Sequence, residues 1–141
     1  MTHSSSNEDY QFKTEVESCR FPVDDFNHKA HLRLAYVYLV DNDPESSVVL
    51  MRDTLKLYLA HNGVDPNYYH ETVTKEWILA VSYFMSVSRK TDSANELLTE
   101  FPELLDKNTI LIHYSEDVLF SDEARNKFLQ PNLEPIPLVA R

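Results

Sequence analysis

The stretch Phe26–Val40, with the sequence FNHKAHLRLAYVYLV, decides the fold class, because its second half is apolar on every side of a helix. A helix that is apolar all round is buried in the centre of a protein. Asp24 or Asp25 is the expected N-cap, since a carboxylate accepts hydrogen bonds from the free N–H groups of a first helical turn. We therefore expect a central helix here, with other helices packed around it.

Helical patterns continue on both sides of this segment. Asp43-Pro44 is a typical helix start, and Asn62-Gly63 is a typical left-handed helix end. Apolar side chains recur at spacings of three and four from Tyr68 to Arg89, which predicts the longest helix. Shorter helices or helical turns are predicted over residues 11–20, 94–100, 101–106, 108–113, 116–120 and 124–129. The sequence thus predicts an all-α protein, a compact irregular bundle of about five to seven helices.

The chain of 141 residues has the length of one domain. Residues 1–9 are polar and offer nothing apolar to bury, so they are expected to form a disordered N-terminal tail. Residues 10–130 are expected to form the single helical domain. Residues 131–141 contain three prolines and are expected to run extended as a C-terminal tail.

Composition excludes several classes of protein. A net charge of −10 disfavours nucleic acid and anionic membrane surfaces as partners. The single glycine excludes the glycine-rich loops that bind nucleotides, and the single cysteine excludes disulfide frameworks and thiolate zinc sites. No apolar run approaches the ~18 residues of a membrane span, and the start lacks a secretion-signal pattern. We therefore expect a cytoplasmic protein.

Three histidines are candidate metal ligands. His28 and His31 lie one turn apart and share an arc of about 100° with apolar residues of the central helix, so both face the core. His70 opens the long helix on its apolar stripe. Three imidazoles that converge could hold a divalent transition metal ion and leave positions open for water. The alternative is that these histidines are structural, with backbone or acidic partners.

Other polar residues near these histidines complete the predicted site. Glu71 and Tyr114 are the candidate catalytic groups, because a carboxylate or a phenol can move protons at a metal-bound water. Arg33, Tyr69 and Trp77 are the candidate ligand-binding residues. The alternative for Arg33 is a structural ion pair, and its expected partners are Glu71, Glu76 and Asp106.

Several motifs together resemble a family of small all-helical bacterial proteins of unknown function. They are the segments 26–35 and 69–74 with Trp77, the segments 113–115 and 120–125, and the segment 130–135. The resemblance covers roughly residues 20–137. It implies an all-helical cytoplasmic protein and carries no reaction, cofactor or catalytic residue.

Two functions follow from these patterns as hypotheses. The first is a small-molecule enzyme, metal-assisted, with a histidine-lined polar pocket inside the bundle. The second is a non-catalytic binding module that uses the same pocket for a small anionic ligand or a protein partner. The sequence does not specify an oligomeric state.

Overall fold

A computed structural model describes residues 3–135, which fold into seven α-helices and four short 3₁₀ helices without a strand. The α-helices are α1 (Asn7–Glu17), α2 (His28–Asp41), α3 (Pro44–His61), α4 (Glu71–Val87), α5 (Ala94–Glu100), α6 (Glu116–Leu119) and α7 (Asp122–Asn126). The 3₁₀ helices are η1 (Val23–Asp25), η2 (Pro66–Tyr68), η3 (Pro102–Leu105) and η4 (Lys107–Ile112). The predicted all-α class is confirmed.

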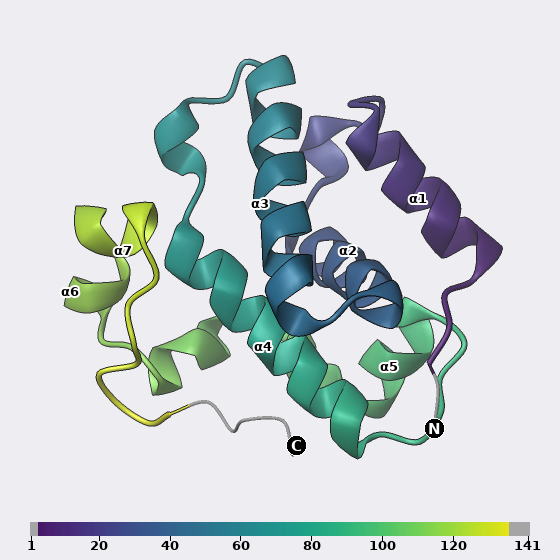
Figure 1. Cartoon of the computed structure of the whole chain (residues 1–141). Coiled ribbons are helices and arrows are strands. Elements are labelled where there is room, and N and C mark those ends of the chain that lie inside the picture. The colour runs from purple at the N-terminus through teal and green to yellow at the C-terminus, as the bar shows by residue number, and fades with distance from the viewer. Residues whose placement is uncertain (1–2, 136–141) are drawn as a thin grey trace.

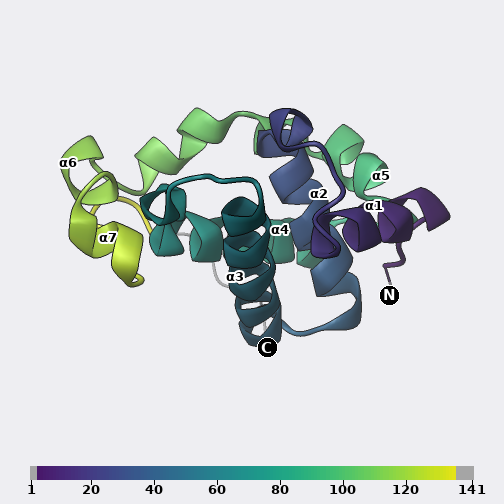
Figure 2. The same cartoon turned by 90° about the horizontal axis from the view of Figure 1, so that it is seen from above.

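Helix α4 crosses the middle of the molecule and packs against α2, α3 and α7 (Figure 1). Helix α2 is the other central element, and it also contacts α1, α3, α5 and η3. Seen from above, η3 and η4 connect α5 at one end of the molecule to α6 at the other, on the side away from α3 (Figure 2). The faces of α4 are therefore covered by different elements along its length.

The core confirms the central position of α2. Leu34, Ala35, Tyr36, Val37 and Tyr38 are at most 1% exposed, so five consecutive residues of one helix are buried. A helix on the surface buries only one stripe of side chains, whereas α2 is covered on all sides.

No helix in residues 3–135 has both the length and the apolar character that crossing a membrane requires.

Local capping signals set the ends of α3 and the start of α5 as predicted. The Asp43 carboxylate accepts a hydrogen bond from the Ser46 N–H at 2.7 Å, and Pro44 occupies the first position of α3. Ser93 and Ser121 cap α5 and α7 in the same way. Gly63 follows α3 with a φ of 71°, in the left-handed region that glycine enters without strain.

Several helix boundaries differ from the predictions. Helix α1 spans Asn7–Glu17 instead of residues 11–20, and α7 spans Asp122–Asn126 instead of residues 124–129. The N-cap of α2 is Asn27, because Asp24 and Asp25 belong to η1. Helix α4 begins only at Glu71, because η2 takes up residues 66–68, and at 17 residues α4 is shorter than α3 with 18. The prediction that the segment from Tyr68 forms the longest helix was wrong.

The predicted disordered tail over residues 1–9 is also wrong for residues 3–9. Helix α1 begins at Asn7, and the backbone N–H of Ser4 donates to the Thr91 carbonyl at 2.9 Å. The carboxylate of Asp9 is 2% exposed and accepts a hydrogen bond from the Ala94 N–H. Polar contacts rather than apolar burial hold this segment, so composition gave no sign of it.

Residues 131–135 of the predicted extended tail carry no helix and run beside η4. The N–H of Leu133 donates to the His113 carbonyl, and the N–H of Glu134 donates to the Ile112 carbonyl. Residues 136–141 of that tail lie outside the described residues.

Candidate functional site

His31 and His70 line one cavity of about 320 Å³ between the starts of α2 and α4, the end of α3 and the segment around η2. We call it the histidine cavity. Its apolar lining residues are Val23, Phe26, Leu55, Leu59, Val64 and Val73, and its polar ones are His31, His70, Tyr68, Tyr69 and Thr74. Within the part of the chain that the structure describes, no Asp, Glu, Lys or Arg lines this cavity.

The imidazole of His31 makes no side-chain hydrogen bond within residues 3–135, and its Nδ1 is buried without a partner. Burial, together with a smaller effect of the neighbouring His28 imidazole, lowers the pKa of His31 to about 4. At neutral pH the ring is therefore uncharged. Because Nδ1 is enclosed by protein atoms, Nε2 is the ring nitrogen that another molecule can reach.

His70 lies in the same cavity, but both of its ring nitrogens have protein partners. Nδ1 accepts the N–H of Val73 at 3.2 Å, which makes His70 the N-cap of α4. Because Nδ1 accepts, Nε2 carries the proton, and it donates to the Leu119 carbonyl at 2.6 Å. Burial lowers the pKa of His70 as well. His70 therefore acts as a neutral structural wall of the cavity.

His28 does not line the histidine cavity. Its Nε2 forms a hydrogen bond with the Leu104 carbonyl at 2.9 Å, and its ring meets Trp77 edge-on at 4.6 Å between centroids. No group of three or more His, Cys, Asp or Glu side chains in residues 3–135 is arranged to hold a metal ion. The three predicted ligands therefore do not form a common group.

Glu71 and Tyr69 belong to a polar cleft beside the histidine cavity. The carboxylate of Glu71 accepts two hydrogen bonds from Arg52, at 2.9 and 2.6 Å, and a third from the Tyr69 hydroxyl at 2.7 Å. The Arg52 hydrogen bond is the main cause of the lowered pKa of Glu71. Glu71 is thus a fixed anion, which is poorly suited to the proton transfer expected of it.

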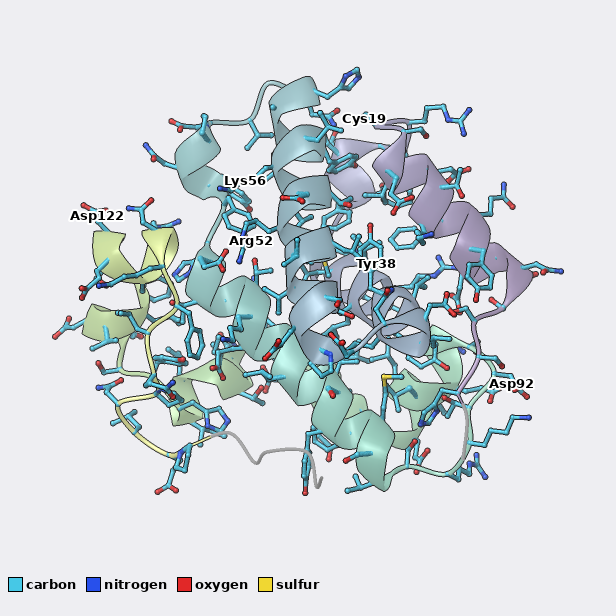
Figure 3. The ribbon with its side chains drawn as sticks, in the orientation of Figure 1. Cys19, Tyr38, Arg52, Lys56, Asp92 and Asp122 are labelled. Atoms are coloured by element: carbon cyan, nitrogen blue, oxygen red, sulfur yellow. The ribbon has the colours of Figure 1, made fainter. Side chains whose placement is uncertain are left out.

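The polar cleft itself has a volume of about 870 Å³. Arg52 and Lys56 of α3 project toward the side on which α7 carries Asp122 (Figure 3). Charges of both signs line the cleft, and the ammonium of Lys56 lies 5.2 Å from the centroid of the Tyr69 ring. Neither sign of charge dominates, so the cleft shows no preference for an anion.

Arg33 is a structural residue in this geometry. Its Nε donates to the Asp9 carboxylate at 2.8 Å, and its guanidinium lies 4.6 Å from the centroid of the Phe12 ring. Arg33 therefore forms a structural ion pair, as the alternative interpretation expected. Its partner is Asp9 and none of the three acids expected from the sequence. Asp9 was missed because it falls in the segment expected to be a disordered tail.

Tyr114 and Trp77 lie at a second cavity of about 270 Å³, formed by α4, η3 and η4. We call it the glutamate cavity, because Glu76 is part of its wall. The remaining lining residues are Trp77, Ala80, Tyr83, Phe84, Glu103, Leu104, Thr109, Ile110, Ile112 and His113. Tyr114 does not line the cavity but contacts Glu76 from behind, at 3.0 Å between its hydroxyl and Oε1.

Glu76 is the residue that sequence reasoning missed as a functional candidate. Its side chain is 2% exposed, and Oε2 is buried without a hydrogen-bond partner. Burial raises the pKa of Glu76 to about 7. One sequence signal could have revealed it: Glu76 lies three residues after Val73 and four before Ala80, so it is an acid on the apolar stripe of α4.

The contact between Glu76 and Tyr114 indicates which group carries a proton. The Tyr114 hydroxyl has one hydrogen, and two acceptors compete for it: the Leu129 carbonyl at 2.6 Å and Glu76 Oε1 at 3.0 Å. When Tyr114 donates to Leu129, only a protonated Glu76 can complete the second hydrogen bond. The geometry thus agrees with a raised pKa for this carboxyl group.

The chain matches no known family model, no curated protein and no solved structure. The resemblance to a family of small helical bacterial proteins thus stays a prediction.

Proposed function

We propose that the protein is a non-catalytic binding module whose histidine cavity holds a small, neutral, largely apolar molecule with one hydrogen-bonding group. The observation that carries this proposal is the imidazole of His31, which lines the cavity without any hydrogen-bond partner from residues 3–135. A mostly apolar cavity with few polar groups is the usual form of a small-molecule site.

The charge of the cavity favours a neutral ligand over the anionic one considered from the sequence. No cationic side chain lines it, and burial keeps both His31 and His70 uncharged near neutral pH. An anion entering this cavity would lose its hydration without gaining an opposite charge, which is strongly unfavourable. A phenol, an alcohol or an amide can instead exchange hydrogen bonds with a neutral imidazole.

The same contacts favour a binding module over the metal-assisted enzyme. Glu71 is held as an anion by Arg52, Tyr114 lies at the other cavity, and His70 uses both ring nitrogens for the backbone. A metal ion bound by His28, His31 and His70 stays a prediction that these hydrogen bonds do not favour. A cytoplasmic location likewise stays a prediction.

The test compares three probes of one shape: p-cresol, which is neutral, p-toluate, which is anionic, and 4-methylbenzylamine, which is cationic. We expect p-cresol to raise the Tm of the full chain and to shift the His31 ring signals in ¹H–¹³C NMR spectra. The two charged probes should leave both unchanged. Equal responses to p-cresol and p-toluate would contradict a neutral ligand.

Two variants localise the response. His31→Leu removes the unpaired imidazole and should weaken p-cresol binding by about tenfold, the effect of ~1.4 kcal/mol from one lost hydrogen bond. His61→Leu is the matched control, because His61 is an exposed histidine at the end of α3. Stoichiometric zinc binding that disappears in His31→Leu, without p-cresol binding, would favour the metal hypothesis instead.

A further inference from the structure

The glutamate cavity is separate from the histidine cavity and has the opposite chemistry. The two share no lining residue. The glutamate cavity is formed along the middle and end of α4, whereas the histidine cavity lies at its start. Two acids, Glu76 and Glu103, line the glutamate cavity, and no Lys or Arg among residues 3–135 does.

A buried carboxyl group needs hydrogen-bond partners for both of its oxygens, and residues 3–135 supply a partner for only one of them. Tyr114 contacts Oε1 of Glu76, but Oε2 is buried with no partner from residues 3–135. Lys75 is the neighbouring cation in sequence, and its ammonium lies 4.3 Å from the centroid of the Phe128 ring. It does not line the cavity, and its charge acts on the Glu76 carboxyl group only as a minor cause that lowers the pKa. Within residues 3–135, Glu76 forms no salt bridge with a Lys or Arg side chain.

Aromatic side chains form much of the remaining wall. Trp77, Tyr83 and Phe84 follow one another along α4 and line the cavity together with aliphatic residues such as Ile110. Aromatic faces attract organic cations electrostatically, and a carboxylate at the same site adds a direct ion pair. A net charge of −10 on the whole chain also favours the approach of a cation.

We propose that the glutamate cavity is a binding site for a small organic cation, an amine with an apolar or aromatic body, whose ammonium group pairs with Glu76. When Glu76 is ionised and paired with the ligand, the Tyr114 hydroxyl donates its one hydrogen to Oε1 instead of to the Leu129 carbonyl. The aromatic residues of α4 contact the body of the ligand. This site is independent of the neutral ligand proposed for the histidine cavity.

Trp77 gives a direct measurement of binding, because it is the only tryptophan of the chain and lines the cavity. The experiment titrates the full chain with benzylamine and with its neutral isostere benzyl alcohol and follows tryptophan fluorescence. At pH 8 we expect benzylamine to bind at least tenfold more tightly than benzyl alcohol. Equal affinities, or no response to either probe, would overturn the proposal.

The pH dependence separates an ion pair from simple apolar contact. Benzylamine stays protonated from pH 5.5 to pH 8, whereas Glu76, with its pKa of about 7, is mostly protonated at pH 5.5. The affinity for benzylamine should therefore fall by up to about thirtyfold at pH 5.5, in proportion to the ionised fraction of Glu76. Other titratable groups near the cavity are Glu103, His113, Lys75 and Tyr114.

Two variants assign the effect to Glu76. Glu76→Gln keeps the shape of the protonated acid and should remove both the preference for benzylamine and its pH dependence. Glu103→Gln is the matched control and should change the affinity less than threefold, because Glu103 is an exposed acid of η3. A Glu76→Gln variant that still prefers benzylamine would overturn the proposal. If that variant does not fold, the affinities of the wild-type chain for benzylamine and benzyl alcohol test the proposal instead.

Discussion

The histidine cavity and the glutamate cavity each contain one ionisable side chain without full hydrogen bonding, and burial shifts the two pKa values in opposite directions. The pKa of His31 is lowered to about 4, and the pKa of Glu76 is raised to about 7. In both cases burial disfavours the charged form. Burial thus favours the neutral form of both groups. Because one group is a base and the other an acid, their effects on the free energy of unfolding oppose each other as the pH changes.

The opposition follows from proton linkage. Folded Glu76 holds its proton more tightly than the unfolded chain does, so its contribution to stability is present at low pH and is lost as the pH rises from about 4.5 to about 7. Folded His31 holds its proton less tightly, so stability is lost as the pH falls from about 6.5 to about 4. The two windows overlap, and the two slopes should largely cancel in the wild-type protein.

The largest expected effect comes from Glu76→Gln. Gln mimics the protonated acid and cannot ionise, so at pH 8 the variant should be more stable than wild type by roughly 3 kcal/mol, because burial raises the pKa of Glu76 from 4.5 to about 7 and each pKa unit corresponds to about 1.36 kcal/mol. At pH 4 the difference should be close to zero. Urea unfolding at both pH values measures it.

The control for this measurement is Glu103→Gln, which removes an exposed acid from the same cavity. It should change the free energy of unfolding by less than about 0.5 kcal/mol at either pH. If Glu76→Gln changed the free energy of unfolding equally at pH 4 and pH 8, the pKa of Glu76 would be the same in the folded and unfolded states, and burial would not raise it.

We expect His31→Leu to change the free energy of unfolding by about 1–2 kcal/mol. Its pH dependence should be opposite to that of Glu76→Gln. Leu cannot gain a proton, so the variant should be more stable than wild type at pH 4.5, where the buried imidazole opposes folding. At pH 7.5 the gain should shrink, because His31 is then neutral in both states. Unfolding curves of His31→Leu and His61→Leu at the two pH values test this, and a gain that grew with pH would be the contrary result.

The smallest effect expected is the coupling energy between His31→Leu and Glu76→Gln, measured in the double variant. The cavities share no lining residue, so the two changes in unfolding free energy should add within about 0.5 kcal/mol. His28 provides the connection that could break this rule, since it precedes His31 by one turn and contacts Trp77 of the glutamate cavity. A double-mutant cycle with a coupling above 1 kcal/mol would show that the cavities act as one unit.

The candidate site was only partly predictable from the sequence. The placement of His31 and His70 toward the core followed from helical periodicity, and the structure brings both to one cavity. The same reasoning placed His28 with them, yet its ring turns to the Leu104 carbonyl. Periodicity fixes which face of a helix a side chain occupies, whereas the neighbour it meets there depends on how the helices cross.

The sequence by itself determined the all-α class and the ends of helices such as α3, because both depend on residues close together in the chain. Asp43-Pro44 and Asn62-Gly63 delimit α3 through contacts that span about three residues, and no other part of the chain is needed. Only the tertiary structure decided that Asp9 pairs with Arg33 and that Glu76 is buried beside Tyr114. These contacts join residues 24 and 38 positions apart, and helix packing alone brings such residues together.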